Sequence, residues 1–216
     1  MTAIATLKTR HRAVRDTQPD ALRTRIHRAL SWLARAEREA DDPDARFLFL
    51  WIAFNAAYAS EFGFEQTERE QTRRFIDTLL RCDTQHRLQD TLLHEFTGSI
   101  RNLIENRFVF EPYWKALRDH DSSGQWEKQF AASKRVALRA LLDHDTATVL
   151  SVVLDRLYVL RNQLVHGGAT WRGRANRAQV RDGARIMGAL APVIVEVMME
   201  SDAAEFGEIA FPWVAD

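Results

Sequence analysis

Three polar residues, Arg161, Asn162 and His166, bring together the side chains with the clearest chemical potential in this sequence of 216 residues. An arginine supplies a planar, permanently charged fork that matches the oxygens of a phosphate. A histidine can accept or donate a proton near neutral pH, and at the end of a helix it also meets the negative end of the helix dipole. The group that suits these residue types best is a phosphodiester.

The spacing of Arg161 and His166 sets a geometric condition on this chemistry. Five residues along a regular α-helix leave two side chains about 140° apart, so they do not share a face. Either the helix loosens before Gly167, or a second copy of the domain brings its own pair alongside. The second route predicts a symmetric dimer with the site at its two-fold interface.

The element that carries these residues is predicted as a helix over residues 146–165. Its apolar positions recur at helical spacing, and Gly167 and Gly168 form a good C-terminal stop. Further helices are expected at 19–40, 45–62, 66–81, 84–96, 126–142 and 175–199. The helix at 45–62 is apolar nearly all round and should lie at the centre of a bundle. Pro192 is expected to kink or break the last helix.

The composition favours an all-α protein, an antiparallel helical bundle with a helical insertion. Nine Gly and five Pro leave few places for turns, while 46% hydrophobic residues can bury a sizeable core. We expect a flexible basic N-terminus at 1–17 and a single helical domain at 18–216. The signal weakens from residue 97, so an insertion around 97–145 is expected, with short helices near 100–108 and 113–117.

Charge and cysteine content narrow the classes of protein. Thirty basic and thirty acidic residues balance, but residues 161–185 hold six Arg and one acid, and residues 196–216 hold six acids and no Lys or Arg. This asymmetry can steer an anionic ligand to one face. A single cysteine, Cys82, excludes an internal disulfide, and no apolar run is long enough for a signal peptide or a membrane span. We therefore expect a soluble, cytoplasmic protein.

A basic stripe follows the histidine. Arg174, Arg177, Arg181 and Arg185 fall within about 80° of one another on a helix that begins near Ala175. They could hold an RNA backbone by charge, with Trp171 stacking on an unpaired base. The alternative is an ordinary solvated helix face.

Two Asp-His-Asp triplets resemble metal ligands, at residues 119–121 and 143–145. Each precedes a possible helix, so capping and turn formation explain them more simply. We therefore predict no metal site and no cofactor.

The segment Arg161-Asn162-Gln163-Leu164-Val165-His166 resembles the Arg, polar residue, spacer and His motif of the HEPN superfamily. The helix ending in Val165-His166-Gly167-Gly168 is similar to many bacterial members. The run from Phe47 to Tyr58 also resembles the buried helix of the Apea-like branch. The resemblance covers these two segments and the helical order between them, and leaves residues 97–145 unaccounted for.

The resemblance implies a helical bundle that dimerises and, in many members, cuts RNA without a metal. His166 would then act as general base or general acid, Arg161 would stabilise charge on the phosphate, and Asn162 would orient one of them. The expected function is a metal-independent endoribonuclease of the HEPN type, a toxin or antiviral defence factor. Its expected partners are RNA, a second copy of the chain and an antitoxin such as a nucleotidyltransferase-like protein.

Two alternatives remain at this point. A non-catalytic HEPN module could use the same dimer and basic stripe to bind RNA or a protein. In a purely structural arrangement, Arg161 and His166 would instead be buried, capping the helix and pairing with acids of a neighbouring helix.

Overall fold

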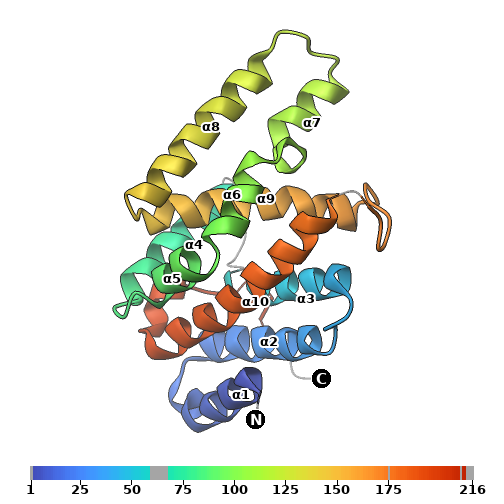
Figure 1. Cartoon of the computed structure of the whole chain (residues 1–216). Helices are drawn as coiled ribbons and strands as arrows, with labels where there is room; N and C mark the ends of the chain where they lie inside the picture. Colours follow the sequence, from blue (N-terminus) through green and yellow to red (C-terminus); the bar gives the residue numbers. More distant parts are fainter. Residues whose placement is uncertain (1, 59–67, 175, 210, 213–216) are drawn as a thin grey trace. The chain divides into compact units, whose positions relative to one another are not determined.

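The computed structural model describes residues 2–58, 68–174, 176–209 and 211–212, and its regular elements are all helices (Figure 1). The protein is an all-α helical bundle, as the composition and periodicity predict. The described residues form two compact units. The first joins residues 1–88 to 184–216, and the second is residues 89–183. The expected insertion, 97–145, lies inside the second unit together with the helix that carries Arg161.

The first unit is built on a helical hairpin, α2 (Asp20–Glu37) and α3 (Pro43–Tyr58), which lie side by side in Figure 1. The turn between them ends where the carboxylate of Asp42 accepts the backbone N–H groups of Asp44 and Ala45, which caps the start of α3. Trp51, Phe54 and Tyr58 line a buried face of α3. The nearly apolar sequence of α3 is thus accounted for by its place in the core.

Three further helical segments of the first unit lie after the hairpin in the sequence. They are α4 (Glu68–Cys82), the part of α10 (Arg177–Glu200) from residue 184 onwards, and η4 (Ala203–Phe206). Helix α10 continues past Pro192, where a kink or break was expected. Phe75 of α4 packs against the rings of Phe54, Tyr58 and Phe206, so the aromatic core joins α3, α4 and η4.

The N-terminal segment, where a flexible basic stretch was expected, is helical over residues 3–17. Ala3–Val14 form α1, Arg15–Thr17 form the short helix η1, and α1 packs against α2. Ile4, Leu7 and His11 are buried at a spacing of three to four residues. The many charged residues between them conceal this apolar stripe in the sequence.

The second unit contains the helices that lie around the candidate site. They are η2 (Thr91–Glu95), α6 (Thr97–Glu105), η3 (Arg107–Val109), α7 (Glu111–Arg118), α8 (Gln125–Leu142) and α9 (Thr146–Val165). The short helix α5 (Arg87–Asp90) spans the boundary between the units. Helices α7 and α8 form an antiparallel pair (Figure 1), and α9 packs against α6, α8 and η3.

None of the helices in the described ranges is long and apolar enough to cross a membrane.

Candidate functional site

Helix α9 begins and ends at the residues that its sequence predicts. The Asp145 carboxylate accepts the backbone N–H of Thr148 at 3.1 Å and also its hydroxyl, which caps the N-terminus. Gly167 has a φ of 71°, in the left-handed region that favours glycine, and the N–H of Ala169 donates to the carbonyl of Gln163. These two ends fix where His166 leaves the helix.

A buried arginine fixes α9 within the second unit. Arg156 is 3% exposed, and its guanidinium carbon lies 4.4 Å from the ring centroid of Phe110 and 5.5 Å from that of Phe130. Its side chain also donates to the hydroxyl of Ser133 at 3.1 Å. Burial lowers the pKa of Arg156 to about 10, against the opposing charge of Asp155. Stacking on two rings partly replaces the lost hydration of this cation.

Arg161 and Asn162 are half-buried in the last turns of α9, and their side chains are joined. The Arg161 guanidinium donates to the Asn162 amide oxygen at 2.8 Å, and its central carbon lies 5.9 Å from the ring centroid of Tyr158. This hydrogen bond holds the Arg161 guanidinium against the side chain of Asn162. Most of the guanidinium's five N–H donors remain available for a ligand.

His166 is exposed and stands directly after the helix. Its backbone N–H donates to the carbonyl of Asn162 at 3.0 Å, the i to i−4 bond of a regular helix. The helix therefore does not loosen before Gly167, and positions 161 and 166 of such a regular helix point about 140° apart. One chain does not bring the two side chains onto a common face.

The structural alternative is contradicted by the surroundings of these residues. It required Arg161 and His166 to be buried and paired with acids of a neighbouring helix. Instead His166 is exposed and Arg161 is half-buried, and within the described part of the chain neither pairs with an acid. Both groups are open to a ligand.

Comparisons of the chain with models of protein families, with curated proteins and with solved structures give no match. The interpretation of the site therefore depends on its own geometry and chemistry.

Gln163 has a role that the sequence analysis missed, where it was only the spacer of the motif. Its amide nitrogen donates to the Phe108 carbonyl at 2.6 Å, and its amide oxygen accepts from the Asn176 side chain at 2.6 Å. The same Phe108 carbonyl accepts the indole N–H of Trp114 at 2.8 Å. Gln163 thus ties the end of α9 to η3 and to the residue before α10. No feature of the sequence indicated these partners.

The segment between α9 and α10 carries Trp171 and Arg174, and both are exposed. Trp171 is 68% exposed, and the guanidinium carbon of Arg172 lies 4.7 Å from its ring centroid. Arg174 lies outside the helix that was expected to carry it, because α10 begins at Arg177. Asn176 is the residue directly before that start. Its φ of 53° lies in the left-handed region, and its side chain donates to the amide oxygen of Gln163.

The other three arginines of the basic stripe do lie on α10, at intervals of four residues. Arg177 is half-buried, whereas Arg181 and Arg185 are exposed. Positions four apart lie on one face of a helix, so the stripe exists for these three residues. Arg177 and Arg181 belong to the same unit as Arg161, and Arg185 belongs to the other. Of the expected RNA-binding residues, four thus lie in the same unit as His166: Trp171, Arg174, Arg177 and Arg181.

The Asp-His-Asp triplets serve as turns and caps, as the sequence predicts. Asp121 accepts the backbone N–H of Ser123 at 2.8 Å, and Asp145 caps α9. Hydrogen bonds from Ser123 and Thr148 lower the pKa of Asp121 and Asp145 respectively. His120 and His144 have φ values of 51° and 56°, which are turn conformations. The described residues contain no group of three or more His, Cys, Asp or Glu placed to hold a metal ion.

Proposed function

We propose that this protein is a metal-independent endoribonuclease of the HEPN type. The observation that carries the proposal is the accessibility of Arg161 and His166 at the end of α9, a phosphate-binding cation and a proton-transfer group left open to a ligand. A buried, acid-paired arrangement would have removed this chemistry.

Each residue has a defined task in the proposed reaction. His166 takes the proton of a ribose 2′-hydroxyl, or gives a proton to the departing 5′-oxygen. The 2′-oxygen bonds to phosphorus as the bond to the 5′-oxygen breaks, which yields a 2′,3′-cyclic phosphate and a 5′-hydroxyl. Arg161, oriented by Asn162 at 2.8 Å, stabilises the charge that develops on the phosphate oxygens.

In this proposal a homodimer brings the side chains of Arg161 and His166 together. Because the regular end of α9 keeps Arg161 and His166 about 140° apart in one chain, Arg161 of one copy meets His166 of the other across a two-fold axis. Trp171 and the basic stripe, Arg174, Arg177, Arg181 and Arg185, would bind the flanking RNA by stacking and charge. A cytoplasmic toxin or defence factor, silenced by an antitoxin such as a nucleotidyltransferase-like protein, fits such an activity.

Purified protein tests the proposal directly with a mixed RNA substrate in EDTA. The parent should give products ending in 2′,3′-cyclic phosphate, and His166→Ala should abolish them while leaving the helical content and the dimer unchanged. His94→Ala is the matched control, because His94 is also an exposed histidine and contacts Asp90 instead. Cleavage that persists in purified His166→Ala would remove the proposal.

The second candidate is a non-catalytic module that binds RNA or a protein through the same surface. It is favoured by the separation of Arg161 and His166 on α9 of one chain, because binding does not need the two side chains to meet, whereas catalysis needs a dimer to bring them together. In that case no product would appear, His166→Ala would bind as well as the parent, and Arg181→Gln would weaken RNA binding in a salt-dependent manner.

A further inference from the structure

Three aromatic rings lie together in the second unit, within the insertion expected at residues 97–145. They are Phe108 of η3 and Tyr113 and Trp114 of α7, which we call the aromatic cluster. The ring centroid of Phe108 lies 5.6 Å from that of Tyr113 and 6.3 Å from that of Trp114. Phe108 is 39% exposed, whereas its neighbour Val109 is fully buried and anchors η3. The cluster therefore presents an aromatic side chain to solvent from a fixed backbone.

Arg107 adds a cation to the aromatic cluster. Its guanidinium carbon lies 5.0 Å from the ring centroid of Phe108 and 5.5 Å from that of Tyr113. Arg107 is exposed, and within the part of the chain that the structure describes it forms no ion pair. The acids on either side of it in the sequence, Glu105 and Glu111, contact other cations. Its positive charge is therefore open to a ligand.

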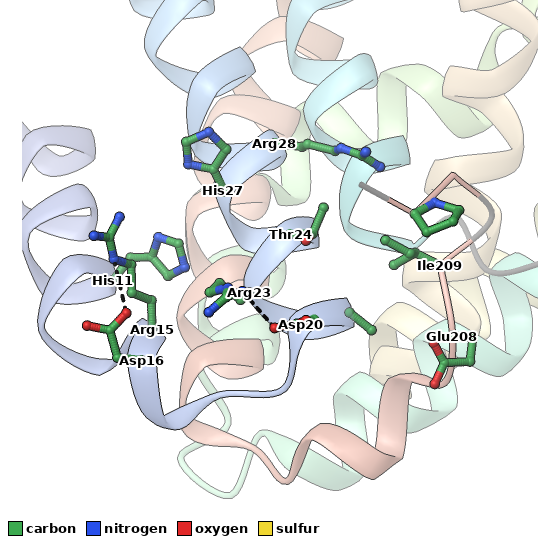
Figure 2. Close-up of a pocket in the computed structure, with 12 residues that line it drawn as sticks. His11, Arg15, Asp16, Asp20, Arg23, Thr24, His27, Arg28, Glu208 and Ile209 are labelled. Atoms are coloured by element: carbon green, nitrogen blue, oxygen red, sulfur yellow. Dashed lines mark hydrogen bonds and ion pairs between the residues drawn. The ribbon is translucent and has the colours of Figure 1, made fainter. Parts of the chain in front are cut away.

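The arginines of a pocket in the first unit differ from Arg107 in this respect. The pocket lies along α2 and has a volume of about 580 Å³. Its lining includes His11, Arg23 and Ile209. Arg23 pairs there with Asp20 at 2.6 Å, and Arg15 pairs with Asp16 at 3.6 Å (Figure 2). These two charges are already compensated, so the aromatic cluster is the better candidate for an anionic partner.

The aromatic cluster is tied to the end of α9 that carries the candidate site. The Phe108 carbonyl accepts hydrogen bonds from the side chains of Gln163 at 2.6 Å and Trp114 at 2.8 Å. Gln163 and His166 are three residues apart at the regular end of α9, so their side chains lie on the same side of the helix. Arg161 points about 160° away from Gln163. The cluster thus lies on the His166 side of α9.

The composition of the second unit favours a polyanion. Residues 89–183 hold 14 Lys or Arg and 11 Asp or Glu, whereas the rest of the chain holds 16 and 19. A positively charged unit attracts the phosphates of a nucleic acid. Aromatic rings and guanidinium planes are the surfaces on which unpaired bases stack. In a duplex the bases are already stacked on one another and cannot use such a surface.

We propose that Arg107 and the aromatic cluster bind a base beside the cleaved phosphate, and that the substrate is therefore single-stranded RNA. This inference rests on the ribonuclease function proposed above. The base stacks against Phe108 and Arg107 while the adjoining phosphate lies at His166 of the same chain. Because every base has a flat face, this contact selects unpaired RNA without selecting a sequence.

Binding is measured first, in a His166→Ala background in which the RNA stays intact. Fluorescence anisotropy follows a labelled, mixed-sequence decanucleotide. Phe108→Leu should weaken its binding about tenfold, because leucine has no ring for a base to stack on. Phe211→Leu is the matched control, since Phe211 is also exposed but belongs to the first unit, and it should bind as the background does.

Salt separates stacking from charge. The loss caused by Phe108→Leu should stay about tenfold as the salt concentration rises, whereas the loss caused by Arg181→Gln should shrink. Arg107→Gln should weaken binding about threefold, and it decides the test if circular dichroism shows that Phe108→Leu fails to fold.

Cleavage is measured next, with His166 intact. The parent should cut a single strand at least tenfold faster than a duplex of the same sequence, and Phe108→Leu should raise the KM for the single strand about tenfold.

The outcomes distinguish this inference from the ribonuclease itself. Undiminished RNA binding by Phe108→Leu, while the parent still cuts RNA, would overturn the base-binding role and leave the ribonuclease. Binding that depends on Phe108 without cleavage by the parent would support the base-binding role and overturn the ribonuclease. Absence of RNA binding by the parent would overturn both. A Phe108→Leu chain that no longer dimerises would assign the aromatic cluster to the contact between copies instead.

Discussion

Arg25 gives the sharpest prediction about stability, because one buried cation holds three parts of the first unit together. It is 2% exposed and donates to the carbonyls of Ala57 at 3.1 Å, Phe206 at 3.1 Å and Glu208 at 2.6 Å, with a longer bond to Gly207 at 3.4 Å. Replacing it with methionine keeps most of the volume and removes every one of these bonds. The end of α3 and the C-terminal segment then lose their shared donor.

The magnitude follows from two opposing contributions. Burial, opposed by the charge of Glu208, lowers the pKa of Arg25 from its usual range to about 10, and one pKa unit is worth about 1.4 kcal/mol, so burying the charge costs about 3 kcal/mol. The closer hydrogen bonds, at about 2 kcal/mol each, exceed that cost by about 3 kcal/mol. Arg25→Met should therefore lower the free energy of unfolding by about 3 kcal/mol.

Urea denaturation followed by circular dichroism measures this change, and the midpoint should fall by about 1 to 2 M. A glutamate-specific protease should also cleave the variant faster at Glu205 and Glu208. Arg28→Met, which removes a single exposed bond to Phe211, is the matched control and should cost less than about 1 kcal/mol. An Arg25→Met protein as stable and as protease-resistant as the parent would refute the assignment of Arg25 as the anchor of this segment.

Two further predictions concern other polar contacts. Gln163→Leu should lower the free energy of unfolding by about 1 kcal/mol and speed amide hydrogen exchange in residues 166–176, because it removes the bonds to Phe108 and Asn176; unchanged exchange there would contradict the bridging role. The hydrogen bonds to Arg87 and Arg10 lower the pKa of Glu200 from 4.5, so its contribution to stability is present above pH 4.5 and is lost as the pH falls below it. Chemical denaturation of Glu200→Gln between pH 7 and pH 3 should accordingly show a weaker pH dependence than that of the parent.

Local signals explain which parts of this structure the sequence could predict. Helix α9 was predicted at its observed ends because Asp145 and Gly167 act within one turn of them. The contact between Asn176, just before α10, and Gln163 could not be predicted, because the two residues are thirteen apart in the sequence. The helical N-terminus was missed because its apolar stripe is hidden among charges. The pocket lined by His11, Arg23 and Ile209 could not be predicted from sequence patterns, because these residues come together only after folding.

The regular end of α9 also makes the proposed active site testable by complementation. If each site combines Arg161 of one copy with His166 of the other, Arg161→Ala and His166→Ala homodimers should both be inactive. A mixed dimer of the two variants would retain one site with both residues intact and one site with neither.

Random mixing in equal amounts makes about half of the dimers mixed, and each mixed dimer has one active site of two. RNA cleavage should therefore return to about a quarter of the parent rate. A site contained within one chain predicts no recovery, because every chain in the mixture lacks either Arg161 or His166. Absence of recovery despite verified subunit exchange would thus reject the shared site. Because α9 is a regular helix to Val165, Arg161 and His166 could then not act on the same phosphate.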